Sequence, residues 1–228
     1  GIAKYLPSAI GHLVESEITA LDHIIKEDTH PFIVVMGGKK ISDKTLVIDN
    51  LITKCDKIIL GGAMCFSFLA AKNINTGSSL VDTDNISYCK TILSKYPDKI
   101  VLPLDILTKD EIVRDINSLE PDDIGYDIGP KTISLYQSIL KNAKRVIING
   151  PMGVFEDPKF SIGTKSLYET LASNNVETLI GGGDSAASVN ALGFENSFYH
   201  ISTGGGATLE YLSGKTLPGI DIISEKEG

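Results

Sequence analysis

Short apolar runs alternate with amphipathic segments along most of the chain. The β-branched run PFIVVMGG at 31–38 ends in two glycines, which is typical of a buried parallel strand. The segment DKIILGGAMCFSFLAAKN at 56–73 repeats the order of strand, double glycine and helix. Before both, residues 8–28 carry apolar side chains at spacings of mostly three and four. This spacing predicts a helix that Ser8 caps after Pro7.

The alternation continues toward the end of the chain and is interrupted by one polar stretch. Residues 106–130 lack a helical period, and they predict short strands and turns at one edge of the fold. The other predicted segments are helices at 42–55 (with Ser42 or Asp43 near its start), 87–96, 132–143, 166–174 and 184–193, and strands or strand-to-loop segments at 99–105, 145–156, 178–183 and 200–207. Strand–helix alternation with short connections predicts a parallel sheet with helices on both faces.

Five of the predicted strands end in glycines. The clusters are Gly37-Gly38, Gly61-Gly62, Gly150 with Gly153, Gly181 to Gly183, and Gly204 to Gly206. In parallel sheets ligands bind at the carboxyl ends of the strands, so the clusters are expected along one ligand-binding edge. A tight turn explains any single cluster, whereas five together predict a backbone that approaches phosphate groups closely. Neither GxGxxG nor GxxxxGK[ST] occurs, which disfavours a dehydrogenase-type dinucleotide domain and a P-loop.

Composition narrows the classes of partner. The 228 residues suffice for one large domain or two small ones, and the net charge is −8. This charge argues against nucleic-acid or membrane-surface binding, so an anionic ligand needs local lysines and backbone N–H groups. Three cysteines without a CxxC spacing predict reduced thiols in a cytoplasmic protein. The sequence has neither a signal segment nor an apolar run near the roughly 20 residues that span a bilayer.

Two stretches carry candidate chemistry beside the glycines. In TLIGGGDSAASVNALG, Asp184 and Ser185 stand at a predicted helix start. Either these side chains cap the helix, or phosphate oxygens take its free N–H groups and Asp184 holds a Mg²⁺ ion that bridges them. In GGKKISDK, Lys40 and Lys44 would share a helix face, which is unfavourable without an anion beside them. A solvated lysine pair is the alternative.

A third stretch and one aromatic cluster complete the candidates. NGPMGVFE ends in Glu156, which is either an acceptor for ribose hydroxyls or a simple surface side chain. Met64, Phe66 and Phe68 are expected in the core, although one of them could line a pocket for a base.

The motifs together resemble one family. GGKKISDK, IILGGAM, NGPMGVFE, TLIGGGDSAA and HISTGGGATLEYLSGKTLPG occur in the order found in phosphoglycerate kinases and cover the chain nearly end to end. The chain resembles the carboxyl-terminal half of these enzymes, the half that binds Mg-ADP and Mg-ATP. The resemblance implies a Rossmann-like three-layer α/β sandwich with a mostly parallel sheet. The complete enzyme would move a phosphoryl group between 1,3-bisphosphoglycerate and ADP, giving 3-phosphoglycerate and ATP in glycolysis or gluconeogenesis.

The resemblance also implies roles for single residues. Catalytic roles fall on Lys40, Lys44, Gly182 and Gly205. Nucleotide contacts are implied for Lys40, Lys44, Gly61, Gly62, Gly129, Asn149, Pro151, Glu156, Gly182, Gly183, Asp184 and Ser185. Asp184 is the implied magnesium ligand, and Ser185 keeps the hydroxyl of the family's more usual Thr. Lys39 departs from the family pattern, since many members have a small residue there.

The resemblance further divides the chain. Residues 1–30 are expected to be an inter-domain connector and hinge helix, 31–206 the nucleotide-binding domain, and 207–228 a segment that packs on an amino-terminal domain. That domain, with its 3-phosphoglycerate pocket, is absent from the sequence, so the apolar sides of the end segments should be exposed. We expect nucleotide binding with negligible transfer activity, no nucleic-acid or membrane partner, and a monomer in the full-length enzyme. A non-catalytic adenine-nucleotide-binding module is the alternative function.

Overall fold

The computed structural model describes residues 1–26 and 28–224. Its main sheet has the strand order β3-β2-β1-β7-β8-β9, and all neighbouring pairs are parallel. Its strands are β1 (Phe32–Met36), β2 (Lys57–Leu60), β3 (Ile100–Val101), β7 (Arg145–Asn149), β8 (Glu177–Ile180) and β9 (His200–Ile201). A smaller antiparallel sheet, in the order β5-β4-β6, contains β4 (Asp105–Thr108), β5 (Val113–Asp115) and β6 (Gly125–Ile128). The short strands predicted for 106–130 are therefore confirmed.

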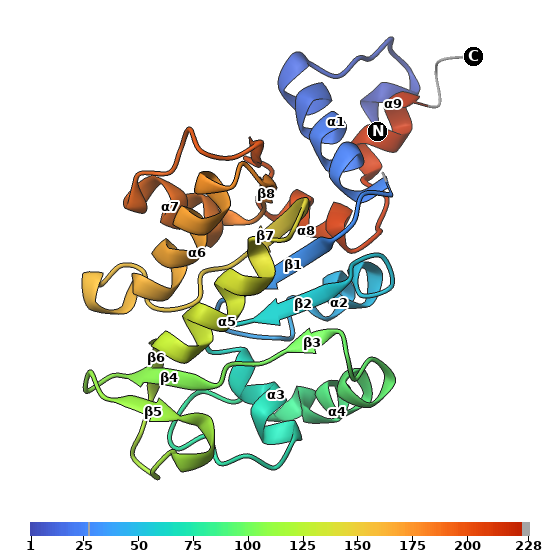
Figure 1. The fold of residues 1–228 in the computed structure, drawn as a ribbon. Coiled ribbons are helices and arrows are strands. Elements are labelled where there is room, and N and C mark those ends of the chain that lie inside the picture. The colour runs from blue at the N-terminus through green and yellow to red at the C-terminus, as the bar shows by residue number, and fades with distance from the viewer. Residues whose placement is uncertain (27, 225–228) are drawn as a thin grey trace.

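Helices cover both faces of the main sheet (Figure 1). Alternate residues of β1 enter two separate hydrophobic clusters: Val34 and Met36 pack into one, Ile33 and Val35 into the other. The first cluster includes residues of α1 (His12–Lys26), α2 (Thr45–Leu51), α3 (Cys65–Ala71), α4 (Ile86–Lys95) and α8 (Gly206–Leu212), and the second includes residues of α5 (Pro130–Leu140), α6 (Ile162–Ser173) and α7 (Gly183–Leu192). The predicted three-layer α/β sandwich with helices on both faces is confirmed.

Short elements complete the described chain. Four single-turn helices are η1 (Ile2–Lys4), η2 (Thr83–Asn85), η3 (Ile116–Ser118) and η4 (Pro158–Phe160), and α9 (Pro218–Ser224) follows α8 near the end. Figure 1 shows α1 projecting away from the sheet, with α9 beside the η1 turn at the start of the chain. The sequence pattern predicted neither α8 nor α9 as a helix. Within residues 1–26 and 28–224, none of the helices combines the length and apolar character needed to cross a bilayer.

The predicted start of the first helix is wrong. The helix begins at His12, and the Ser8 hydroxyl donates instead to the carbonyl of Leu6 at 3.0 Å. Gly11 lies directly before the helix, and its carbonyl accepts from the N–H of Glu15 as the first helical bond. Glycine is a poor residue inside a helix, which explains why the apolar spacing across it does not extend the helix to Ser8.

The apolar side of the amino-terminal segment is exposed, as expected. Leu13 is 68% exposed, whereas Ile24 on the same helix is fully buried. The exposed apolar residues of this segment are Ile2, Tyr5, Leu6, Ile10, Leu13 and Val14. In the carboxyl-terminal segment Leu217 and Ile220 are half-buried, so the exposed surface is concentrated on residues 2–14.

Candidate functional site

The five glycine clusters lie at one edge of the main sheet. The last residues of β1, β2 and β7 are in register, since Met36 pairs with both Leu60 and Asn149. Ile180 at the end of β8 pairs with Ile148 and with Ile201 of β9. Each cluster follows its strand directly or within a few residues. The predicted glycine-rich carboxyl edge therefore exists, and it is the place where parallel α/β sheets bind ligands.

The glycines of this edge serve two different purposes. A Cβ at Gly37 would lie 1.9 Å from the Pro151 carbonyl oxygen, and one at Gly62 would lie 2.4 Å from the Gly38 nitrogen. At Gly150 a Cβ would lie 2.4 Å from the Gly37 carbonyl oxygen. These glycines let the chain's own loops pack together, which explains the lack of a side chain at these positions without a ligand; the approach of phosphate groups to these loops stays a prediction. Around Gly183 there is nothing within 4 Å of a Cβ, which leaves open space.

Lys44 is fixed at the edge by a buried asparagine. Its ammonium donates to the carbonyl oxygen of Asn149 at 3.1 Å and also to the Asn149 side-chain oxygen. The amide nitrogen of Asn149 donates in turn to the Gly181 carbonyl at 2.9 Å. Burial lowers the pKa of Lys44 to about 8, although the charges of Asp184 and Asp43 favour its charged form. The lysine is thus a pre-positioned cation beside the β7 and β8 exits.

The two lysines do not share a helix face. α2 begins at Thr45 with Lys44 as its N-cap residue, and Lys40 lies in the irregular segment before it. The predicted helix at 42–55 is therefore shorter than its apolar pattern suggested, and the expected repulsion between stacked ammonium groups does not arise. Lys40 is exposed near Lys44 in sequence but is not held by Asn149.

The amino terminus of α7 has no side-chain cap. Gly182, with φ of 93°, is the N-cap residue, and in the part of the chain that the structure describes no side chain accepts from the first helical N–H groups. Asp184 lies in the first turn and is exposed, whereas Ser185 is buried and its hydroxyl oxygen accepts from the Gly150 N–H at 2.6 Å. The capping alternative for Asp184 and Ser185 is wrong, because glycine provides the backbone geometry of the cap. A helix amino terminus with free N–H groups favours anions.

A cavity of about 500 Å³ opens beside Asp184. One part of its lining is apolar and aromatic, including Phe66, Leu80 and Tyr126. The charged residues of the lining are Lys39, Asp127, Glu156 and Asp184. Gly62 and Pro151 also line it, and Phe66 is 2% exposed, so one of the expected core aromatics also lines a pocket. Cavities of this size with an apolar wall and a few polar groups are typical of small-molecule sites.

Asp127 is a buried carboxylate that the sequence analysis missed. It accepts from the backbone N–H of Ile128 at 2.8 Å and of Gly163, in the first turn of α6, at 2.7 Å. Burial raises the pKa of Asp127 to about 7, and the two backbone hydrogen bonds oppose this rise. A Cβ at Gly153 or Gly163 would lie 2.3–2.4 Å from its Oδ1 atom. Glycines at both positions make room for this carboxylate, but their distance along the chain gives no local signal that points to Asp127.

The remaining predicted residues fall outside the lining of this cavity. A Cβ at Gly61 would lie 2.4 Å from the sulfur of Met152, and one at Gly129 would lie 2.4 Å from the Asp105 carboxylate carbon. The residues that line the cavity in this region are 124–128, directly before the predicted Gly129. Gly205, with φ of 53°, is the N-cap residue of α8 and has nothing within 4 Å of a Cβ.

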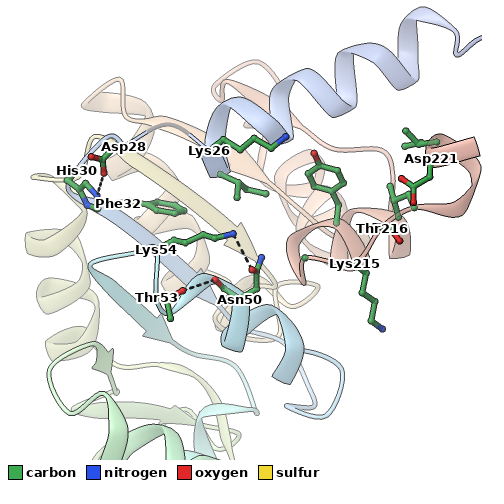
Figure 2. A pocket seen from close by; sticks show the side chains of 15 residues that line it. Lys26, Asp28, His30, Phe32, Asn50, Thr53, Lys54, Lys215, Thr216 and Asp221 are labelled. Carbon is green, nitrogen blue, oxygen red and sulfur yellow. Dashed lines mark hydrogen bonds and ion pairs between the residues drawn. The ribbon is translucent and has the colours of Figure 1, made fainter. Parts of the chain in front are cut away.

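A larger cavity of about 700 Å³ lies elsewhere (Figure 2). It is lined by the end of α1, the residues leading into β1, the end of α2 and the connection from α8 to α9. Phe32, the first residue of β1, belongs to its lining, so it opens at the amino edge of the sheet. Size alone would favour this cavity, but the free helix terminus, Lys44 and Asp184 all lie at the carboxyl edge.

Glu17 of α1 holds the base of the last glycine loop. Its Oε1 atom accepts from the N–H of Thr203 at 2.7 Å and from the Thr203 hydroxyl at 2.9 Å. Its Oε2 atom accepts from the Ser202 hydroxyl at 2.8 Å and lies 3.0 Å from Nε2 of His200. Burial by itself raises the pKa of Glu17, but these hydrogen bonds outweigh it and lower the pKa below its usual value. The helix before the sheet is therefore tied to the residues that precede Gly204–Gly206.

We expect Glu17→Gln to loosen this loop. The amide of glutamine has one acceptor oxygen, so it cannot accept all four contacts, and its NH₂ group would face a donor. Each charge-assisted hydrogen bond that is lost should lower the stability of the loop by about 1–3 kcal/mol. Hydrogen exchange at residues 203–206 should become faster. Because the pKa of Glu17 is lowered in the folded chain, its stabilisation is present above its unfolded pKa and is lost as the pH falls. Glu15→Gln, an exposed carboxylate on the same helix, is the matched control; equal exchange in both variants would contradict the anchoring role.

The fold defines the class of the protein: a doubly wound, Rossmann-like α/β domain, with its candidate ligand site at the carboxyl ends of its strands. The family model described as Phosphoglycerate kinase matches residues 1–215. The chain belongs to the phosphoglycerate kinase family, as its motifs predicted.

Individual relatives agree with this assignment. The chain is 47% identical to the Phosphoglycerate kinase of Pseudothermotoga lettingae, covering 100% of this chain and 60% of the relative. It is 48% identical to that of Fusobacterium nucleatum, with 96% and 57% covered. The solved structure of phosphoglycerate kinase from Coxiella burnetii superposes with a TM-score of 0.94 at 31% identity, covering 100% of this chain and 62% of that one. The chain thus spans less than two thirds of the length of the relatives it matches.

Proposed function

We propose that this chain is the nucleotide-binding part of a phosphoglycerate kinase. The whole enzyme would transfer a phosphoryl group between 1,3-bisphosphoglycerate and ADP. The observation that carries the proposal is the juxtaposition of a half-buried, asparagine-held Lys44 with the uncapped amino terminus of α7. A cavity large enough for a nucleoside begins beside the first turn of the same helix. This arrangement supplies cationic and N–H donors for phosphates at one end and apolar contacts for a base at the other.

The residues of the chain would act by positioning and by stabilising charge. Phosphoryl transfer has little covalent chemistry for a protein to perform, so fixed donors around the transferring group provide most of the rate enhancement. Lys44 is fixed before substrate arrives, because Asn149 already holds its ammonium. Its pKa of about 8 leaves it mostly protonated at pH 7, and a neighbouring phosphate would stabilise that charge further. Lys40, the N–H groups at Gly182 and Gly183, and the Gly205 loop would complete the surroundings of the phosphates.

Asp184 fits the role of a magnesium ligand. The carboxylate is exposed in the first turn of α7, where it lines the cavity. Among the residues that the structure describes, no group of three or more His, Cys, Asp or Glu could hold a metal ion without the substrate. Mg²⁺ usually takes one or two carboxylates and completes its coordination with phosphates and water. When bound, the ion would neutralise phosphate charge, and Asp184 would hold it at the helix terminus.

The remaining residue roles follow from a nucleotide with its phosphates at the α7 terminus and its base in the cavity. Glu156 lies at the wall of the cavity, where it would accept from ribose hydroxyls. Gly62 and Pro151 line the same cavity, and the strand Gly125–Ile128 would take the place that we had expected for Gly129. Gly61 and Ser185 would support the site by packing and hydrogen bonding, since Ser185 already bonds to the Gly150 N–H.

The domain limits also remain part of the proposal. The relatives are longer than this chain. Residues 1–30 would connect to the part of the enzyme that this chain does not span, and residues 207–228 would pack on that part. The exposed apolar residues on 2–14 support this for the first segment.

We propose a monomeric, cytoplasmic enzyme with ADP or ATP and the two phosphoglycerates as partners, and without nucleic-acid or membrane partners. This chain alone should bind Mg-ADP with negligible transfer activity, and addition of a separately made amino-terminal half should restore turnover. Binding without restoration would favour the non-catalytic module.

Asp184→Asn tests the proposal. The amide keeps the size of the side chain but removes the charge that would hold the ion. We expect calorimetry to show that Mg²⁺ no longer strengthens ADP binding, while ADP without metal binds at least as well as to the unchanged chain because a repulsive charge has gone. Asp43→Asn removes an exposed acid close to Lys44 and serves as control. An unaltered magnesium dependence in Asp184→Asn would contradict the metal role.

A further inference from the structure

Lys39 differs from Lys40 and Lys44, the other lysines of its motif, because it faces the cavity beside α7. Of Lys39, Lys40 and Lys44, only Lys39 lines the cavity beside α7. The other charged members of that lining are the carboxylates of Asp127, Glu156 and Asp184, so Lys39 is its one cation among the described residues. Its side chain is exposed and takes part in no hydrogen bond or ion pair within residues 1–26 and 28–224. The ammonium is therefore available to a ligand.

The residue before Lys39 is held by backbone hydrogen bonds to two other segments. The preceding Gly38 donates its N–H to the Pro151 carbonyl at 3.0 Å, and its carbonyl accepts from the Met64 N–H at 3.1 Å. Gly38 has φ of 94°, a conformation that suits glycine, and its neighbour Gly62 also lines the cavity. The lysine thus leaves a fixed loop at the point where the cavity meets the sheet edge.

We infer that Lys39 binds the phosphate next to the nucleoside. This inference rests on the proposed function, in which Lys44 and the α7 terminus take the outer phosphates at the sheet edge. Lys39, Glu156 and Tyr126 all line the cavity, and Lys39 follows the glycines at the end of β1. In this proposal a nucleotide that extends from the sheet edge into the cavity passes Lys39 first, and its sugar and base lie with Glu156 and Tyr126. An ammonium there offsets the repulsion between the phosphates and the three carboxylates of the lining. Lys39 therefore adds to the nucleotide affinity that Lys44 and the α7 terminus supply, and the phosphoryl group in transfer remains with Lys44.

Titrations of Lys39→Ala with ADP, AMP and adenosine test the inference on this chain. The loss of one partly exposed charge-assisted contact should weaken ADP and AMP binding by a similar factor, about three- to tenfold, and leave adenosine unchanged. Added salt should reduce the difference between the two proteins, because the contact is exposed. Lys39→Arg should restore affinity.

Lys215→Ala is the matched control, since it removes an exposed lysine beside the larger cavity (Figure 2) and should alter none of these affinities. An unchanged ADP affinity in Lys39→Ala would overturn the inference, as would an equal loss for adenosine, which would mean that the lysine packs on the base. Failure of the unsubstituted chain to bind ADP at all would instead count against the proposed function.

Discussion

Replacing Lys44 by methionine is expected to weaken ADP binding about ten- to hundredfold at pH 7. The substitution keeps most of the buried side-chain volume and removes the charge that Asn149 holds at the sheet edge. A charge-assisted hydrogen bond to phosphate contributes about 1.5–3 kcal/mol, which corresponds to this range of affinities. In a chain that also carries the rest of the family's length, turnover should fall further, by about 10² or more, if the lysine stabilises charge in the transition state.

The pH dependence gives this prediction a second readout. Burial lowers the pKa of Lys44 to about 8 in the free chain, and a bound phosphate must raise it because the anion stabilises the ammonium. Binding above pH 8 therefore takes up a proton, and ADP affinity should fall as the pH rises from 8 to 10. Lys44→Met should show no such fall. Calorimetry at several pH values measures both effects, and the same decline in the variant would assign the titration to another group.

Exchanging two glycines for alanine should have opposite effects on stability. Gly37→Ala would place a methyl group 1.9 Å from the Pro151 carbonyl oxygen and 2.8 Å from the Met152 methyl carbon. The loops that follow β1 and β7 would have to separate, so we expect a loss of about 3 kcal/mol or more in the free energy of unfolding. Gly183→Ala meets nothing within 4 Å and lies in the first turn of α7, so it should stabilise by about 0.4–1 kcal/mol.

The stabilised variant Gly183→Ala should nevertheless bind ADP more weakly than the unchanged chain. Its methyl group would stand at the helix terminus that the phosphates are proposed to approach. Denaturant unfolding and calorimetry on both variants measure the pair of effects. Full ADP affinity in Gly183→Ala would place the phosphates elsewhere, and a stable Gly37→Ala would contradict the packing of the two loops.

The main sheet could be predicted from the sequence because its strands are short and rich in β-branched residues, and its two central strands, β1 and β7, are fully buried. Phe32–Met36 is buried along its whole length, and the glycines after it mark its end clearly. Local chemistry was less predictable where one glycine decides the outcome. The first helix begins only after Gly11, although the apolar spacing continues before it. Gly182 is the N-cap residue of α7, although Asp184 is a residue type that commonly caps helices. In both places backbone geometry prevailed over side-chain propensity.

The contacts that organise the site could not be predicted from one sequence. Lys44 and Asn149 are 105 positions apart, and Glu17 and Thr203 are 186 apart. Neither local spacing nor composition indicates that such residues meet. Asp127 is similar, because its two backbone donors come from its own strand and from the start of α6. The motifs identified the glycine-rich edge of the sheet, whereas the folded chain was needed to separate glycines that support the loops from glycines that leave space.

A crystal structure of this chain with Mg-ADP tests the central claim most directly. The account predicts the diphosphate beside residues 182–185, with its oxygens near the Lys44 ammonium and the base in the cavity lined by Phe66 and Tyr126. A diphosphate bound anywhere else, for example in the larger cavity at the amino edge of the sheet, would contradict it.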